Sequence, residues 1–144
     1  MMLAGCGGGS DETGTSSADS ESLSKAQYVT RADAICSEAN TRQDALLTKE
    51  AQSRSATGVP SDADKESFVL NSGLPPLREA AARLDKLGTP TGDEKKAEAL
   101  VDALDKALDE IEEEPLDFAE AKSNPFAPVE RLARELGLEV CGLP

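Results

Sequence analysis

The feature that most restricts the fold of this chain is an apolar stripe with helical spacing between Thr91 and Pro115. Its members are Ala97, Leu100, Val101, Leu104, Leu108 and Ile111. Because an α-helix places residues at this spacing on one side, the stripe predicts a helix with one face in a protein core. The whole chain has only three Phe, one Tyr and no Trp. Strands draw on β-branched and aromatic residues, so this composition favours an all-α fold.

Cap and break signals divide the first half of the chain into two further helical regions. Ser24–Gln27 fits a capping box, which predicts a helix from Ser24 to about Ser53. The segment Ser61–Asp64 offers similar cap chemistry for a second helix. Gly73–Pro76 is expected to kink or break that helix, because proline lacks an N–H donor and clashes with the preceding turn.

The helices in the second half of the chain have equally clear boundaries. Thr91–Glu94 fits a capping box at the start of the helix that carries the apolar stripe, and Pro115 is expected to end or kink that helix. A last helix is predicted over Val129–Leu136, with Gly137 as its C-terminal cap. Four helical segments with short connections predict an antiparallel bundle of about four helices for residues 23–144.

A short motif lies before this domain. Leu3-Ala4-Gly5-Cys6 resembles the lipobox of bacterial lipoproteins, in which Leu and two small residues precede the cysteine to be modified. The resemblance implies a diacylglyceryl group on the sulfur of Cys6 and cleavage of the chain just before it. Residues 1–5 would then be a signal-peptide remnant. Because the basic and apolar regions of a signal peptide are missing, we expect Met1 to lie inside a longer one.

Residues 6–22 are expected to form the lipidated cysteine and a flexible, disordered tether. Residues 7–22 have almost no apolar content and carry four acidic residues and no basic one, so they cannot form a packed core. A Gly/Ser-type linker of this length spans roughly 20–24 Å on average. We therefore expect the domain to stand clear of the lipid head groups on the extracytoplasmic side of the cell membrane, held by the lipid on Cys6.

The two other cysteines are predicted to form a disulfide. With Cys6 assigned to lipid, Cys36 and Cys141 remain as an even pair, as expected in an oxidising compartment. In the chain-entropy treatment of cross-links, closing a loop of about 100 residues contributes roughly 4.7 kcal/mol. The alternative is that both cysteines are buried free thiols, which pack as small apolar residues.

The charge of the chain restricts its partners. The formal net charge is −13, from 28 acidic and 15 basic residues. Such a chain repels phosphate backbones and anionic membrane surfaces, so we expect no nucleic-acid partner and no electrostatic adsorption to a membrane. The sequence also lacks a run of about 20 apolar residues that could span a bilayer. We expect a monomer that meets the membrane only through its lipid.

The sequence offers little for catalysis. It contains no histidine, which removes the commonest general base and the commonest metal ligand. The glycine run at residues 7–9 precedes no strand–helix unit and so fails as a phosphate-binding loop. We therefore predict no catalytic residues, no cofactor and no metal ligands.

Two groups of residues could nonetheless bind something. An acidic stripe follows the predicted third helix, with Glu113 and Glu114 at its end: Glu98, Asp102, Asp105, Asp109 and Glu112. It is either a weak cation site, since hard cations take several oxygen ligands, or a solvated face opposite the core. Tyr28 and Arg31 could contact a ligand, or Tyr28 could be a core residue with its hydroxyl at the rim.

Two segments give a second resemblance. The stretches QYVTRADAICSEANTR and VERLARELGLEVCG resemble small helical lipoproteins of actinobacteria, which share a cysteine in an ADAIC-like motif and a C-terminal VCG. The resemblance spans roughly Gln27 to Gly142 and implies fold and location, with no activity attached. We therefore expect a non-enzymatic binding or cell-envelope structural module with a protein or cell-wall partner. The alternative is a lipoprotein that binds a small ligand or cation on its acidic face.

Overall fold

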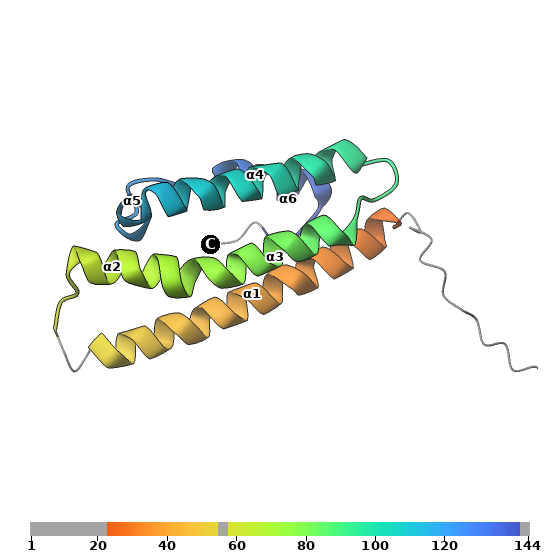
Figure 1. Ribbon diagram of the computed structural model, residues 1–144. Helices are drawn as coiled ribbons and strands as arrows, with labels where there is room; N and C mark the ends of the chain where they lie inside the picture. The colour runs from red at the N-terminus through yellow and green to blue at the C-terminus, as the bar shows by residue number, and fades with distance from the viewer. Residues whose placement is uncertain (1–22, 55–57, 142–144) are drawn as a thin grey trace, which may run out of the picture.

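The computed structural model describes residues 23–54 and 58–141, which form an antiparallel bundle of helices (Figure 1). The predicted all-α fold is confirmed, and the described residues contain no β-structure beyond an isolated bridge between Leu23 and Pro90. The predicted tether and the lipidation site at Cys6 lie outside the described residues.

The first helix begins at its predicted capping box. Helix α1 spans Lys25–Arg54. The N–H of Ser24 donates to Oε1 of Gln27 over 3.0 Å, and the N–H of Gln27 donates to Oγ of Ser24 over 3.2 Å. These bonds satisfy two N–H groups that have no partner within the helix. At 1.5 Å per residue, α1 is about 45 Å long.

The second helical region runs through its prolines without a loop. Helix α2 (Asp62–Phe68), the π-helical turn η1 (Val69–Gly73) and helix α3 (Leu74–Leu87) form one continuous rod (Figure 1). The predicted disturbance at Pro75 and Pro76 takes the form of η1, in which the N–H of Leu74 donates to the carbonyl of Val69, five residues earlier. A wider turn accommodates prolines that cannot donate to the carbonyls four residues before them.

Helix α4 carries the apolar stripe and spans Glu94–Glu113. The capping box predicted at Thr91 is wrong, because the N-cap is Asp93 and its side chain makes no capping hydrogen bond. The two carboxylate oxygens of Asp93 instead lie 2.9 Å from Nζ of Lys25 and 3.1 Å from Nζ of Lys96. Bonds to Lys25 and then Lys96 hold the pKa of Asp93 below its usual value, and the carboxylate bonds to these lysines instead of to an N–H group of the helix end.

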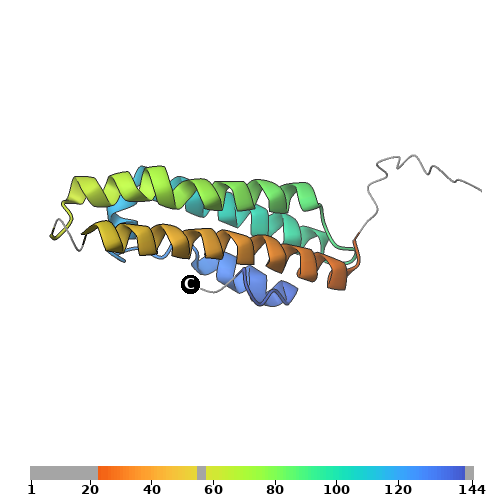
Figure 2. The same cartoon turned by 90° about the horizontal axis from the view of Figure 1, so that it is seen from below.

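The last two helices are short. Helix α5 spans Pro115–Ala119, and α6 spans Ala127–Leu136 and packs along α4. Gly137 ends α6 as predicted, with a left-handed φ of 85° that favours glycine. Across both views the directions alternate along α1, the α2–η1–α3 rod, α4 and α6, as the predicted antiparallel bundle requires (Figures 1 and 2).

The core lies between these helices, but it is not continuous along all of them. In α1 the buried side chains are Tyr28, Ala32, Ile35 and Ala39, and none of the described residues of α1 after Ala39 is buried. The other helices and the segments before α1 and after α6 add the remaining buried hydrophobic side chains: Leu23, Val69, Leu74, Ala80, Ala81, Leu84, Ala97, Leu100, Leu104, Ala107, Leu108, Ile111, Val129, Ala133, Leu136 and Leu138.

The segment that follows α6 is fixed to α1 by a disulfide and a carboxylate. The sulfur atoms of Cys36 and Cys141 are bonded, and their Cα atoms lie 5.1 Å apart. Next to this bond, the N–H groups of Glu139 and Val140 donate to the carboxylate of Asp33 over 3.1 and 2.9 Å. The C-terminal segment is therefore attached to the N-terminal half of α1.

We predict that replacing Cys36 and Cys141 together by serine lowers the free energy of unfolding by about 2–5 kcal/mol, because the disulfide closes a loop across 105 residues. Urea unfolding followed by circular dichroism measures the change. Wild-type protein treated with a reductant serves as the matched control and should unfold at the same urea concentration as the double variant. Equal stability of the oxidised wild type and the variant would contradict the prediction.

Candidate functional site

The bundle is closed at one end and open at the other. Helix α6 has 10 residues and α1 has 30, so α6 accompanies α1 over only part of its length. Figures 1 and 2 show that α6, which packs on α4, lies level with the middle and the N-terminal half of α1, short of its C-terminal turns. The disulfide at Cys36 fixes the following segment to the same half. In the described part of the chain, α6 therefore does not extend over the C-terminal turns of α1.

A cavity of about 640 Å³ lies at this open end. We call it the groove. Its walls are the C-terminal half of α1 and the α2–η1–α3 rod, while α4 and α5 contribute its remaining side chains. The described residues that line it are Gln43, Leu47, Glu50, Ala51, Arg54, Lys65, Phe68, Val69, Gly73, Leu74, Leu77, Ile111, Phe118 and Ala119.

The lining is mostly apolar. Ile111 is 1% exposed and belongs to the core, so the stripe of α4 continues directly into the groove. Phe118 reaches the groove from α5, and its ring packs edge-on against Phe126 with the centroids 6.0 Å apart. At the surface, Leu47 on α1 is 52% exposed. An apolar molecule in the groove would cover side chains that now face water, which is favourable.

Two contacts join the walls of the groove to each other. Nε2 of Gln43 on α1 donates to the carbonyl of Gly73 in η1 over 2.8 Å. Eleven residues further along α1, the guanidinium carbon of Arg54 lies 5.9 Å from the ring centroid of Phe68 on α2, within cation–π range. These contacts hold α1 close to the rod on both sides of the groove.

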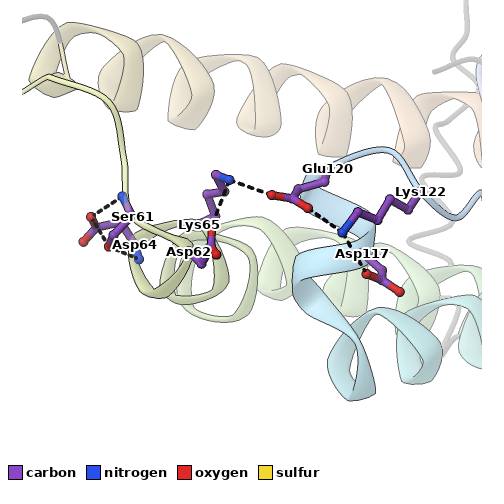
Figure 3. Close-up of polar contacts among 7 residues, drawn as sticks. All are labelled: Ser61, Asp62, Asp64, Lys65, Asp117, Glu120 and Lys122. Atoms are coloured by element: carbon purple, nitrogen blue, oxygen red, sulfur yellow. Dashed lines mark hydrogen bonds and ion pairs between the residues drawn. The ribbon is translucent and has the colours of Figure 1, made fainter.

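The charged side chains that line the groove are paired with one another or with neighbours. Nε of Arg54 donates to Glu50 over 2.8 Å. Nζ of Lys65 donates to Asp62 over 3.0 Å and to Glu120 over 2.8 Å, which links α2 to the turn after α5 (Figure 3). None of the three charged groups in the lining is therefore without an opposite charge.

Glu120 is the centre of this ion-pair network. Its carboxylate lies 2.7 Å from Nζ of Lys122 as well as 2.8 Å from Nζ of Lys65 (Figure 3). Bonds to Lys122 and then Lys65 lower the pKa of Glu120 from 4.5 to about 2. The same pairs raise the pKa of both lysines. The network thus joins α2 to the turn after α5 through a carboxylate that stays ionised in mild acid.

The acidic stripe predicted on α4 lies elsewhere and does not converge. Asp109 and Glu112 each accept a hydrogen bond of 2.7 Å from Arg78 of α3. Glu98 and Asp102 border a small hollow of about 100 Å³ on the surface between α3 and α4. Among the described residues, no group of three or more acidic or cysteine side chains could hold a metal ion. Asp109 and Glu112 are exposed and paired with Arg78, which fits a solvated face opposite the core better than a cation site.

Tyr28 and Arg31 are not part of the groove, and the structure corrects one expectation about them. Arg31 is exposed, whereas Tyr28 is fully buried in the core. The predicted position of the Tyr28 hydroxyl at the rim is wrong, because the hydroxyl is buried and has no hydrogen-bond partner among the described residues. Burial raises the pKa of Tyr28. The ring of Tyr28 lies in the core at the closed end. The helical spacing of the sequence had predicted this position on the inner face of α1.

Comparisons with protein-family models, with curated proteins and with solved structures find no match for the chain. In the part of the chain that the structure describes, no helix combines the length and the apolar character needed to cross a membrane.

Sequence reasoning missed the groove, although one signal for it was present. The predicted last helix, Val129–Leu136, is far shorter than the predicted first helix, which runs from Ser24 to about Ser53. A bundle built from helices of such unequal length must leave part of the longer one without a partner. The contribution of α5 through Phe118 could not be anticipated, because it depends on where the chain turns after Pro115.

We predict that Glu120→Gln lowers the melting temperature at pH 7, because it removes the carboxylate that joins Lys65 and Lys122. A carboxyl whose pKa is lowered on folding stabilises the fold above its unfolded value, near 4.5, and loses this effect as the pH falls towards about 2. The difference between wild type and variant should therefore shrink across that pH range. Thermal unfolding at low salt measures it.

Glu110→Gln provides the matched control for this experiment. Glu110 is an exposed acid of α4, and its side chain makes no ion pair with another described residue. Its replacement should leave a smaller difference from wild type at pH 7. A Glu120→Gln variant whose melting temperature differs from wild type equally at pH 7 and pH 2 would contradict the role of the network.

Proposed function

We propose that the chain is a lipid-anchored, extracytoplasmic lipoprotein whose helical bundle is a non-enzymatic binding module, with the groove as its binding site. The observation that carries the proposal is the groove itself. Its volume of about 640 Å³ lies within the range of small-molecule sites, which are mostly apolar with a few polar groups. Gln43, Glu50, Arg54 and Lys65 supply such groups around an otherwise apolar lining.

The chemistry of the groove supports binding rather than catalysis. Its described lining contains no Ser, Thr, Cys or Tyr that could act as a nucleophile. Its only carboxylate, that of Glu50, is paired with Arg54 at 2.8 Å and faces no second carboxylate in the lining. Acid–base catalysis by carboxylates needs two groups whose environments separate their pKa values, and this lining offers one.

The small-ligand interpretation is better supported at the groove than at the acidic face of α4. On that face Asp109 and Glu112 already share Arg78, and the hollow beside Glu98 and Asp102 has a volume of only about 100 Å³. A small ligand at the groove meets apolar walls, whereas one on the acidic face meets solvated carboxylates.

The proposed location rests on the lipobox resemblance at Cys6 and on the disulfide. A disulfide between Cys36 and Cys141 is typical of proteins that fold in an oxidising compartment, which agrees with export. The acid-rich residues 7–22 would then connect the lipid to Leu23, at the closed end of the bundle.

Intact mass spectrometry of the membrane fraction tests the location. When the chain is expressed in a bacterium behind a complete lipoprotein signal peptide that ends at Cys6, we expect a mature chain starting at Cys6 with the added mass of a diacylglyceryl group. The Cys6→Ser variant is the control and should lack both the added mass and the membrane association. An unmodified wild-type chain in the soluble fraction would contradict the proposal.

Binding in the groove can be tested with the uncharged fluorescent probe N-phenyl-1-naphthylamine, which becomes bright in apolar surroundings. We expect saturable fluorescence with the full chain and at least a tenfold weaker affinity for Ala51→Trp, because an indole at this exposed lining position fills the mouth of the groove. The substitution leaves the buried core of the bundle untouched, since Ala51 is exposed.

Ala45→Trp is the matched control for the probe experiment. Ala45 is also exposed on α1, but it lies about halfway around the helix from Gln43, on the side away from the groove. This variant should bind the probe like wild type. If both tryptophan variants bind the probe equally well, the probe occupies another surface and the groove is not the binding site.

A further inference from the structure

We infer that the ligand of the groove is an uncharged molecule with a single apolar chain, of the kind formed by a long-chain alcohol or a monoacylglycerol. This inference rests on the proposal that the groove is the binding site and adds the chemical class of the ligand. Three features of the groove lead to it: its length, the contacts between its walls and the pairing of its charges.

The length of the groove matches one acyl chain. On α1 the lining runs from Gln43 to Arg54, which is about 16 Å at 1.5 Å per residue. The hydrocarbon core of a bilayer is about 30 Å thick, so the chains of one leaflet span about 15 Å. Leu47, Phe68 and Leu77 are among the apolar side chains that line the groove.

The contacts between the walls restrict the width of the occupant. The hydrogen bond from Gln43 to Gly73 and the stacking of Arg54 on Phe68 both cross from α1 to the rod. A partner helix with its side chains is about 10–12 Å across. Such a helix could lie between α1 and the rod only if both contacts were broken. A slender chain can lie beneath them, so the geometry favours a lipid chain over a helical protein segment.

The pairing of charges determines the head group. Arg54 is bonded to Glu50, and Lys65 is bonded to Asp62 and Glu120. An anionic head group would have to compete with these carboxylates for the two cations, against the repulsion of a chain with a net charge of −13. A cationic head group would have to compete with Arg54 and Lys65 for the carboxylates that are already paired with them. An uncharged head group leaves every pair intact and can use the remaining N–H donors of Arg54.

Displacement of the bound fluorescent probe from the full chain tests the class of ligand. Three competitors of equal chain length are compared below their micelle-forming concentrations: 1-monomyristoylglycerol, myristate and tetradecylamine. We expect the monoacylglycerol to displace the probe at a concentration at least tenfold lower than either charged competitor. Displacement by myristate or tetradecylamine at an equal or lower concentration would overturn the inference.

The outcomes separate this inference from the proposed function. If none of the three displaces a probe whose binding is weakened by Ala51→Trp, the groove is a binding site and the inferred ligand class is wrong. If probe binding is insensitive to Ala51→Trp, both the binding site and the ligand class are wrong. Displacement led by the monoacylglycerol, and weakened in Ala51→Trp but not in Ala45→Trp, supports both.

A charge substitution tests why the ligand is uncharged. Glu50→Gln leaves Arg54 without its carboxylate partner, so the affinity for myristate relative to the monoacylglycerol should rise roughly two- to fivefold, as expected for a partly exposed ion pair. Glu110→Gln removes an equal charge from α4 at a position outside the groove lining and should leave the ratio as in wild type. An unchanged ratio in Glu50→Gln would overturn the argument from charge pairing.

Discussion

The disulfide attaches the C-terminal segment to α1 at Cys36, in the N-terminal half of a helix that continues to Arg54. The division of the bundle into a closed and an open end follows from this attachment. The bonds from Glu139 and Val140 to Asp33 hold the segment at the same level of α1. Among the described residues, α6 and the segment after it cover only the N-terminal and middle turns of α1. The turns after Ala39 consequently extend past the covered part of the bundle, and their inner side lines the groove.

At the open end, two side-chain contacts join α1 to the rod beside the buried core residues that line the groove. Where α1 would otherwise separate from the rod, the side-chain amide of Gln43 bonds to the backbone of η1, and Arg54 stacks on Phe68. The π-helical turn at Val69–Gly73 also places an acceptor at the wall of the groove, because the Gly73 carbonyl receives the Gln43 amide. Single bonds of this kind stabilise a fold modestly, so the open end can adapt to an occupant more readily than the packed end.

Much of the fold could be predicted from the sequence, because it depends on local signals. The caps at Ser24 and Ser61, the stripe of α4 and the glycine at Gly137 all act within a few residues of where they stand, and the structure shows helices that begin or end there. The cap predicted at Thr91 is wrong: the helix begins at Glu94, and the carboxylate of its N-cap Asp93 pairs with Lys25, a contact far apart in the sequence that local signals do not reveal. The groove could not be located for the same reason, since its walls come from four separate parts of the chain.

The position of the groove also fits the proposed anchor. Leu23 and the N-terminal end of α1 lie at one end of the bundle, and the groove begins at Gln43, about 30 Å further along the helix. Figure 1 shows the turns of α1 that line the groove at the end opposite its N-terminus. A lipid on Cys6 would therefore hold the closed end towards the membrane and leave the open end free. In that orientation the groove would face away from the membrane, and its apolar lining would offer a molecule that has left the bilayer surroundings like those it came from.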